Sequence, residues 1–371
     1  MTISHMNKVA LIYDKFTVHG GGERIFRILL ETFPDAEIYA LNAHPRKYWE
    51  SKFKKPIHTP FLGFIFRSRF LIILLYPFAC LLMSTLRINS DLAFVYSSTC
   101  GKYSKLNAKK KILYSNYPNR GLYEIEKIIE NKIIRFFMSP FIWFMKLWET
   151  KQLKKFDQIY SISETSKNAL LKFTGVKSEV LRCPYDRDAM HHHLIISNEK
   201  NIDPFFLLIS RLEPEKDLTH VIEAFNNTDA KLKIIGHGSY LKFLQSKCRN
   251  NNVEFLGFVQ DEQLAAEILK CSAVIFPSEI EYSLVPIEAN SFGKPVIAFD
   301  SSAAREILFD IKLNVNDGTA VFYSKKNGTC LLEAINFFKS CKWNKNMLIK
   351  NSLRFSPDKF KLKILSLIND I

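Results

Sequence analysis

The sequence lacks the cysteine patterns of zinc-binding and disulfide-stapled proteins. Its seven cysteines are scattered along 371 residues, and no two of them form a C-x-x-C pair. Zinc sites and redox motifs use such closely spaced pairs, and secreted disulfide frameworks use even numbers of cysteines. We therefore expect buried thiols in a reducing compartment, without structural zinc and without disulfides.

Long hydrophobic runs are also missing. The uncharged stretch 70–83 has only 14 residues, whereas a helix needs about 20 apolar residues to cross a bilayer. The apolar run near the N-terminus is too short for a secretory signal and contains Tyr13 and Asp14. These absences predict a cytoplasmic protein without a membrane span.

The sequence does contain an excess of positive charge, which is concentrated in one half. Residues 1–190 hold 30 Lys and Arg against 16 Asp and Glu, whereas residues 191–371 hold 22 against 21. Such a field favours an acidic partner surface, such as membrane phospholipid, a phosphate-bearing substrate or nucleic acid. Nothing in the sequence resembles a nucleic-acid-binding module, so we expect no nucleic acid as partner.

Two aromatic, apolar stretches lie in this basic half, at 61–83 and 133–148. Lys and Arg residues border both of them. A core helix and a segment lying in a membrane interface are both compatible with the first stretch. Two such stretches together favour association with an anionic membrane surface.

Strand patterns alternate with helix patterns through both halves of the chain. The expected strands are 9–13, 36–41, 91–97, 111–114 and 157–161 in the first half, and 205–209, 231–235, 253–256, 273–276, 295–299 and 320–323 in the second. This alternation predicts an α/β protein with two doubly wound, Rossmann-like domains facing a central cleft. A polar connection at 184–204 separates them. We expect domains at 1–190 and 203–352, and a helical tail at 353–371 that returns to the first domain.

Several polar or glycine-rich segments follow the expected strands, where ligands of parallel sheets bind. The first strand leads into a Gly-Gly-Gly-Glu-Arg turn at 20–24, and the strand 205–209 leads into Ser-Arg-Leu-Glu-Pro-Glu-Lys at 210–216. A Gly-His-Gly turn stands at 236–238. The strand 273–276 opens the segment 276–300, in which Glu288 lies at an otherwise apolar helix start.

These segments closely resemble the retaining glycosyltransferases of family 4, which have the GT-B fold. The segment 210–216 is similar to that family's donor-phosphate loop, and 236–238 to its G-x-G turn. The segment 271–298 follows its signature region, 20–24 resembles its Gly-Gly-x-Glu-Arg element, and 115–123 occupies the place of its acceptor-side loop. Within the family, the sequence looks nearest to bacterial polysaccharide and O-antigen mannosyltransferases.

The resemblance implies a role for each matching residue. The catalytic residues it implies are Arg211, Lys216, Glu279, Glu281 and Asn116. The residues it implies at the nucleotide sugar are Gly21, Gly22, Gly236, Gly238, Ser283, Leu284, Val285 and Glu288, with Glu288 holding the ribose hydroxyls. Cationic side chains on a strand-end loop can neutralise the charge of a departing diphosphate, so no metal and no other cofactor is expected.

The sequence departs from the family pattern at three positions. The family's signature is a Glu, seven further residues and a second Glu. With Glu288 as the second, the first position is Ile280, with Glu279 and Glu281 on either side. The usual Gly three residues later is Ser283, and a His often found in the first-domain loop is Asn116. Either neighbouring acid therefore remains a candidate for the missing Glu.

The resemblance implies a retaining glycosyltransferase that moves a hexose onto a lipid-linked or growing glycan in surface polysaccharide or O-antigen biosynthesis. Mannose from GDP-mannose is the first candidate donor, and UDP-linked sugars stay open. The first domain would face the acceptor and the membrane, the second would bind the donor, and the protein would sit peripherally on the inner face of the cell membrane. The alternative is a catalytically impaired sugar-nucleotide-binding or scaffolding subunit.

Overall fold

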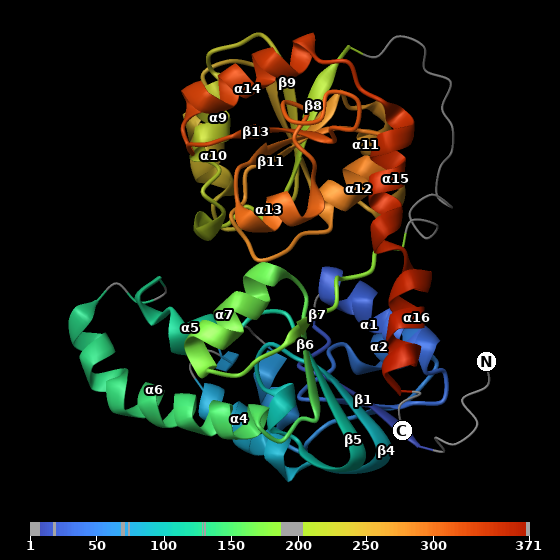
Figure 1. Ribbon diagram of the computed structural model, residues 1–371. Helices are drawn as coiled ribbons and strands as arrows, with labels where there is room; N and C mark the ends of the chain where they lie inside the picture. Colours follow the sequence, from blue (N-terminus) through green and yellow to red (C-terminus); the bar gives the residue numbers. More distant parts are fainter. Residues whose placement is uncertain are drawn as a thin grey trace. The chain divides into compact units, whose positions relative to one another are not determined.

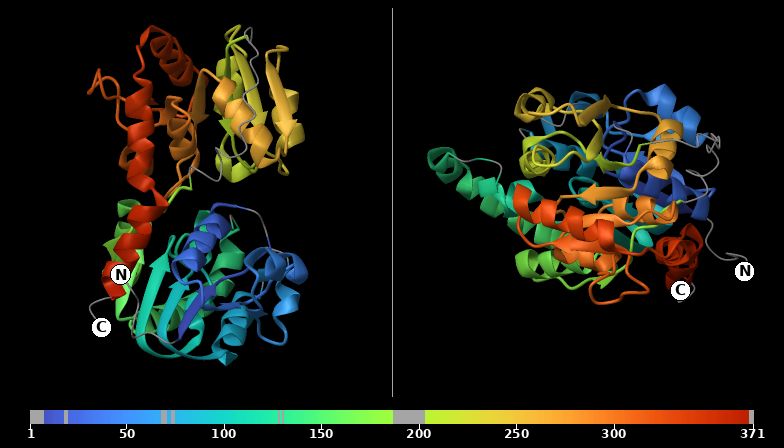
Figure 2. Two further views of the ribbon diagram at one scale, coloured as in Figure 1. Left: turned by 90° about the vertical axis from the view of Figure 1, so that its right-hand side faces the viewer. Right: turned by 90° about the horizontal axis from the view of Figure 1, so that it is seen from above.

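The computed structural model describes residues 8–17, 20–67, 71–72, 75–127, 129, 131–186 and 203–368. The chain divides into two compact units. The first comprises Met1–Cys183 with Phe360–Ile371, and the second comprises Pro184–Lys359. Figures 1 and 2 show that each unit has strands at its centre and helices around them.

The described part of the first unit contains a seven-stranded parallel sheet in the order β3-β2-β1-β4-β5-β6-β7. Its strands are β1 (Val9–Tyr13), β2 (Glu37–Ala40), β3 (Ile57–His58), β4 (Arg87–Tyr96), β5 (Lys105–Ser115), β6 (Gln158–Ser161) and β7 (Glu179–Val180). The central strands are buried on both faces, as their continuous apolar runs predict. β3 and β7 were not predicted, because two residues carry no readable pattern.

The helices of the first unit begin where the sequence supplies caps. The Asn131 side chain accepts from the backbone N–H of Ile133 at 2.9 Å at the start of α6, and Ser163 caps α7 in the same way. The helical segments are α1 (Gly21–Thr32), α2 (Arg46–Phe53), η1 (Gly63–Arg67), α4 (Tyr76–Thr85), η2 (Gly101–Tyr103), α5 (Arg120–Tyr123), η3 (Ile125–Lys127), α6 (Lys132–Leu153) and α7 (Glu164–Thr174).

The described part of the second unit contains a six-stranded parallel sheet in the order β10-β9-β8-β11-β12-β13. Its strands are β8 (Phe205–Ile209), β9 (Lys231–Ile235), β10 (Val253–Gly257), β11 (Ala273–Phe276), β12 (Val296–Phe299) and β13 (Ala320–Tyr323). Each of them was predicted to within one or two residues.

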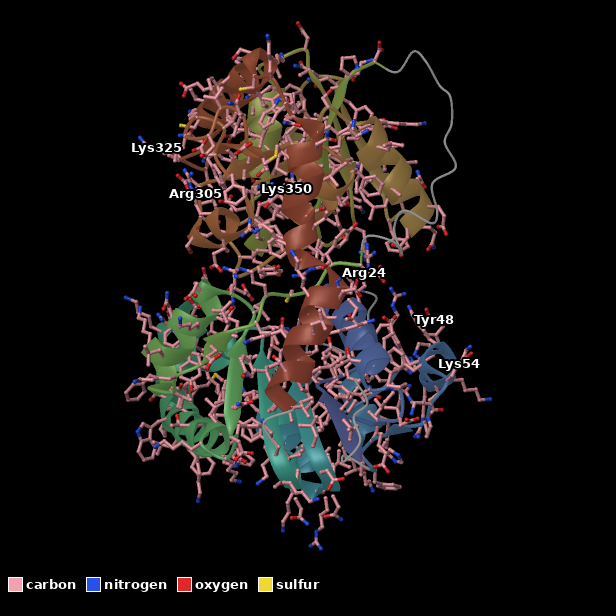
Figure 3. The ribbon with its side chains drawn as sticks, turned by 45° about the vertical axis from the view of Figure 1, so that its right-hand side comes forward. Arg24, Tyr48, Lys54, Arg305, Lys325 and Lys350 are labelled. Atoms are coloured by element: carbon pink, nitrogen blue, oxygen red, sulfur yellow. The ribbon has the colours of Figure 1, made fainter. Side chains whose placement is uncertain are left out.

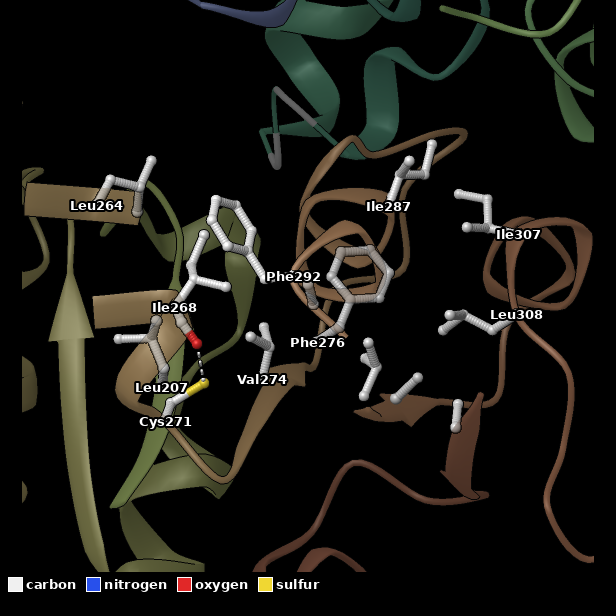
Figure 4. Packing of buried hydrophobic residues seen from close by; sticks show 14 of the residues in the cluster. Leu207, Leu264, Ile268, Cys271, Val274, Phe276, Ile287, Phe292, Ile307 and Leu308 are labelled. Carbon is white, nitrogen blue, oxygen red and sulfur yellow. Dashed lines mark hydrogen bonds between the residues drawn. The ribbon is translucent and has the colours of Figure 1, made fainter. Parts of the chain in front are cut away.

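Helices cover both faces of this sheet, over two apolar clusters. They are α9 (Thr219–Phe225), α10 (Leu241–Lys247), α11 (Asp261–Lys270), α12 (Val285–Ser291), α13 (Ser302–Ile307), α14 (Gly328–Ser340) and α15 (Lys345–Ser352), with the 3₁₀ turns η4 (Pro214–Lys216) and η5 (Leu353–Phe355). In Figure 4, Val274 and Phe276 of β11 pack against Phe292, which follows α12. This packing fixes the loop that joins β11 to α12 at both ends.

The tail helix α16 (Pro357–Ile368) crosses from the second unit to the first. The division falls at Phe360, later than the expected tail start at residue 353, because Phe355 is buried in the core of the second unit. Phe360 stacks obliquely on Tyr114, and Lys361 pairs with Glu31 of α1 at 2.9 Å. The first unit ends at Cys183, before the expected boundary at residue 190.

Candidate functional site

The strand orders locate one candidate site in each unit. In both sheets the order reverses beside the first strand, between β1 and β4 in the first unit and between β8 and β11 in the second. Loops after neighbouring strands diverge at such a switch point, and ligands of doubly wound sheets bind in the space outside the carboxyl ends of those strands. Most of the predicted residues of the second unit lie on the loops after β8 and β11, which flank its switch point, or at the start of α12, and the two glycines of the Gly-His-Gly turn follow β9.

The loop after β8 carries Arg211 and Lys216. The Arg211 side chain is exposed and lies 3.6 Å from a carboxylate oxygen of Glu215, and Lys216 ends the turn η4 half-buried. The next residue, Asp217, has a left-handed backbone conformation with φ 49°. A non-glycine residue in that region costs about 1 kcal/mol or more and is enriched at functional sites. Two cations are therefore presented from one conformationally restricted loop.

The Gly-His-Gly turn after β9 supports this loop. A Cβ on Gly236, whose φ is 137°, would overlap the carbonyl oxygen of Ser210, and a Cβ on Gly238 would overlap that of Leu212. The Leu212 backbone N–H donates to the His237 carbonyl at 2.9 Å. The two glycines were predicted at the nucleotide sugar, and the structure places them against the backbone of the Arg211 loop. Only glycine fits at that approach.

In the loop after β11, the two acids that bracket Ile280 differ in their exposure to solvent. The Ile280 side chain packs against the apolar cluster of the second unit. Glu279 points outward, with its side chain 66% exposed, and pairs with Lys326 at 3.4 Å. Glu281 is half-buried. Ser283 accepts from the Val285 backbone N–H at 3.2 Å, which fixes the entry into α12. Leu284, the N-cap of α12, is half-buried in this loop.

Glu288 is buried at the first turn of α12, with an exposed fraction of 4%. Its backbone N–H donates to the Leu284 carbonyl at 2.8 Å, and its own carbonyl accepts from the Ser291 hydroxyl at 2.7 Å. A buried carboxylate requires hydrogen-bond donors or cations. Its place beside the switch point fits a ligand hydroxyl as one of these donors.

The switch point of the first unit is organised by Asp14, a residue that we did not single out from the sequence. One carboxylate oxygen accepts from the Ser97 hydroxyl at 2.6 Å and the Gly101 backbone N–H at 2.7 Å. The other accepts from the backbone N–H groups of Ser98 and Thr99, at 2.8 and 2.9 Å. We call Ser97–Gly101 the Asp14-binding loop. Asp14 directly follows a predicted strand, and this position was the available signal.

The glycine-rich start of α1 packs against the end of β1. A Cβ on Gly22 would overlap the Tyr13 hydroxyl, which donates to Glu23 at 3.4 Å, whereas Gly21 opens the helix. Burial raises the pKa of Glu23, and it raises the pKa of Tyr13 more strongly. Figure 3 shows Arg24 at this end of α1. The Tyr13 hydroxyl therefore fits beside the helix only because residue 22 is glycine, and Arg24 follows in the first turn of α1.

Asn116 follows β5 at the same edge of the sheet. The last residues of the strands form a row of register partners in which Tyr13, Tyr96 and Tyr114 stack, with ring centroids 5.2 and 5.3 Å apart. The side-chain oxygen of Asn116 is buried without a hydrogen-bond partner among the described residues. Its backbone carbonyl accepts from the Ser166 hydroxyl. Asn116 thus keeps an unpaired buried acceptor atom, and its side chain lies within hydrogen-bonding reach of Tyr96.

Helix α6 exposes a wide apolar face. It consists of Ile133, Ile134, Phe136, Phe137, Phe141, Trp143, Phe144 and Leu147, of which Phe137 is 76% exposed. Phe61, Phe64 and Leu81 are also exposed in the other aromatic stretch, where α4 buries its opposite side in the core. Both stretches therefore combine a core face and an exposed face. Among the described helices, none has the length and apolar character needed to cross a bilayer.

The described residues contain no group of three or more His, Cys, Asp or Glu side chains that could hold a metal ion. The polar connection at 184–204 also contains three consecutive histidines, at 191–193, and Asp188, and these lie outside the described residues. All seven cysteines are free thiols.

Residues 193–355 match the family model described as "Glycosyl transferases group 1". An uncharacterized glycosyltransferase of Methanocaldococcus jannaschii is 29% identical over 154 residues, which are 40% of this chain and 39% of that protein. A serotype-specific mannosyltransferase of Escherichia coli is 22% identical over 181 residues, 42% of this chain and 22% of its own. The matched part spans about two fifths or less of these relatives.

Solved structures resemble the chain over nearly its whole length. The Anabaena protein HepE, solved in complex with UDP, gives a TM-score of 0.70 at 16% identity and covers 98% of this chain and 100% of its own. The sucrose-phosphate synthase of Thermosynechococcus elongatus gives 0.69 at 13% identity, with 98% of each chain covered. These likenesses confirm the predicted fold of two Rossmann-like α/β domains, as in GT-B glycosyltransferases. The matched family model covers nearly all of the second unit, Pro184–Lys359.

Proposed function

We propose that this chain, whose second unit matches the group 1 glycosyltransferase model, transfers a hexose from a nucleotide sugar to a glycan acceptor with retention of anomeric configuration. The observation that carries the proposal is the pairing of two features at one switch point: the cationic loop with Arg211 and Lys216, and the buried carboxylate of Glu288. They match the two ends of a nucleoside diphosphate, its phosphates and its ribose.

The chemistry follows from this arrangement. The bond between the sugar C1 and the diphosphate oxygen breaks, and negative charge builds up on the leaving phosphate. Arg211 and Lys216 stabilise that charge, an effect worth about 3–4 kcal/mol per well-placed donor. An acceptor hydroxyl bonds to C1 on the same face, and its proton passes to the departing phosphate. The residues themselves supply the required charge, so no step uses a metal.

The donor and the acceptor belong to the same proposal. The relatives include proteins named as mannosyltransferases and one named as a D-rhamnosyltransferase, which supports GDP-mannose as the first donor to test. UDP donors stay in the panel, because HepE was solved with UDP and with UDP-glucose. We propose a lipid-linked acceptor of surface polysaccharide or O-antigen biosynthesis.

The enzyme test measures nucleoside diphosphate release and lipid-linked product over GDP-mannose, UDP-glucose, UDP-galactose and UDP-N-acetylglucosamine, with native membrane lipid as acceptor. We expect Arg211→Ala and Glu288→Ala each to lower the rate at least about tenfold. Lys350→Ala, an exposed cation on α15, is the matched control and should keep the wild-type rate. Near-normal rates in both site variants, with intact folding, would disprove this donor site.

The second candidate function is a silent sugar-nucleotide-binding subunit, and it is favoured by the core packing of Ile280 at the family Glu position. Calorimetry with GDP and UDP together with the release assay separates the two functions, because both proteins would bind a nucleotide but only an active enzyme would release one from a donor. Glu279→Gln and Glu281→Gln then test the neighbouring acids. If only one of these variants loses transfer, that acid takes the role of the missing family Glu. If both stay fully active, other groups bind the hexose.

We also propose that the first unit docks peripherally on the anionic inner face of the cell membrane. The apolar face of α6 supplies the inserting surface. Lys132, Arg135, Lys146 and Lys151 on the same helix supply cations, worth about 1 kcal/mol each beside anionic lipid. Flotation with phosphatidylglycerol vesicles tests this part. Phe137→Ser with Trp143→Ser should abolish flotation, and a folded wild type that stays unbound at moderate salt would rule it out.

A further inference from the structure

The first unit contains a buried ion pair that the proposed chemistry does not use. Lys102 is 3% exposed and Glu149 is fully buried, and the Lys102 ammonium donates to a carboxylate oxygen of Glu149. Replacing a buried ion pair by apolar residues of similar size is often neutral or stabilising, because desolvation offsets the attraction. The second carboxylate oxygen of Glu149 has no hydrogen-bond partner within the described chain. Stability alone is therefore a poor explanation for this pair.

The lysine end of the pair is joined to the Asp14-binding loop. Lys102 directly follows that loop, and its ammonium donates to the Ser98 carbonyl at 3.3 Å. Its backbone N–H donates to the Ser97 hydroxyl at 3.3 Å, and the same hydroxyl donates to Asp14. Moving Lys102 therefore moves groups that hold the loop at the switch point of the first sheet.

The glutamate end of the pair belongs to α6. Glu149 lies on the buried stripe of this helix with Ile142, Met145 and Leu153, whereas the apolar face of α6 is exposed. Figure 1 shows α6 at the outside of the first unit. Helix α4 reaches the same loop independently, because its Tyr76 hydroxyl donates to the Thr99 carbonyl at 3.2 Å. Both helices also contact η2, which contains Lys102.

We infer that Lys102 and Glu149 are positioning residues that tie the seating of α6 to the conformation of the Asp14-binding loop. The inference rests on the proposed function in two respects, since it takes the loop to be part of the acceptor side and α6 to dock on lipid. Two elements with exposed apolar surface converge on a single loop whose backbone N–H groups meet one carboxylate. A shift of α6 against a lipid surface is transmitted to that loop through the buried pair.

The test replaces both charges at once, because removing one would strand the other in the core. The variant K102M/E149L is compared with wild type by hydrogen–deuterium exchange of the amides of Ser98, Thr99 and Gly101. We expect these amides to exchange at least about tenfold faster, with the rest of the first sheet unchanged. Met145→Leu, on the same buried stripe, is the control and should leave them protected. Unchanged protection in a folded double variant would overturn the inference.

Kinetics provide a readout that a merely structural role would not move. In K102M/E149L the concentration of membrane lipid acceptor that gives half the maximal rate should rise about tenfold, while nucleotide binding to the second unit stays at the wild-type value. Equal acceptor dependence in both proteins would contradict positioning. If no donor is turned over by wild type, the proposed function fails, and the exchange experiment still decides the positioning role.

An exchange experiment with lipid vesicles tests whether a change at α6 reaches the Asp14-binding loop. Phosphatidylglycerol vesicles should change the exchange of the three loop amides in wild type, whereas K102M/E149L should float with the same vesicles without that response. Vesicle binding with an unresponsive wild-type loop overturns the transmission and leaves membrane docking standing. Absence of vesicle binding by the wild type overturns both the docking and the transmission.

Discussion

The two units are built on the same plan and use it differently. Each has a parallel sheet whose order reverses beside its first strand. In the second unit, Arg211 is exposed and Glu288 is buried beside that point, and Gly236 and Gly238 lie against the backbone of the cationic loop. In the first unit, Asp14 draws a distant loop onto the strand end through four hydrogen bonds.

The two units therefore differ in how the loop beside the switch point is held. The loop with Arg211 is held by backbone contacts with the Gly-His-Gly turn, by the hydrogen bond from Ser239 to Glu213 and by the buried Leu212, and the Arg211 side chain stays exposed. The carboxylate of Asp14 accepts four hydrogen bonds from its own protein, so it fixes the conformation of the loop at the strand end. Under the proposed function, the first arrangement serves the nucleotide-sugar donor and the second serves the acceptor.

Asp14→Asn should have the largest effect on stability, and it tests whether Asp14 organises the first unit. The amide keeps one acceptor oxygen but turns an NH₂ group toward two donors, and each buried donor left unsatisfied costs about 1–3 kcal/mol. We expect the first unit to lose about 3 kcal/mol, measured by urea unfolding with exchange at Ser98 and Thr99 to assign the transition. Asp91→Asn, in the middle of β4 and paired with the exposed Lys109, should cost less than about 1 kcal/mol. Equal losses would contradict a special role for Asp14.

In the second unit, Gly236→Ala tests whether the Gly-His-Gly turn holds the Arg211 loop in place. Gly236→Ala drives a methyl group into the Ser210 carbonyl, so the Arg211 loop must move. We expect nucleotide binding to weaken at least about tenfold, with a stability loss of about 2–4 kcal/mol. Calorimetry with GDP or UDP and urea unfolding measure the two quantities.

Gly257→Ala is the matched control for Gly236. Gly257 has φ 69°, so alanine is strained there too, but no atom lies within 4 Å of the place that its methyl group would take. It should cost about 1 kcal/mol of stability and leave nucleotide binding intact. If the two variants behaved alike, backbone strain rather than the bracing of the loop would be the reason for glycine at 236.

The sequence allowed more of the second site to be predicted than of the first, for a physical reason. Arg211 and Lys216 lie five residues apart on one loop, and Glu288 marks the next motif, so short segments carry the signal. Asp14 and its partners are 83 to 87 residues apart, and Lys102 and Glu149 are 47 apart. Contacts of that range depend on strand order, which periodicity does not contain. The bracing role of Gly236 was also hidden, because a glycine in a turn does not reveal which atom approaches it.

The smallest effect tests the remaining acid of the first site, Glu23. Burial raises its pKa in the folded protein, so the folded state holds the proton more tightly than the unfolded chain does. The stability that belongs to the protonated form is present at acidic pH and is lost as pH rises through the folded pKa. Glu23→Gln stays neutral and keeps an acceptor for the Tyr13 hydroxyl. We expect it to be more stable than wild type at neutral pH, with the difference vanishing on acidification to about pH 4.

Thermal unfolding of both proteins across that pH range measures the trend, and Glu31→Gln on the exposed side of α1 is its control. An acid that costs stability at neutral pH and is nevertheless present fits a residue used for binding, since stability and function often oppose each other at sites. Glu23→Gln should therefore also weaken acceptor-dependent turnover while leaving nucleotide binding to the second unit unchanged. A variant that loses stability at neutral pH would show that the Glu23 carboxylate is held by its neighbours, as Asp14 is. Glu23 would then stabilise the first unit at neutral pH.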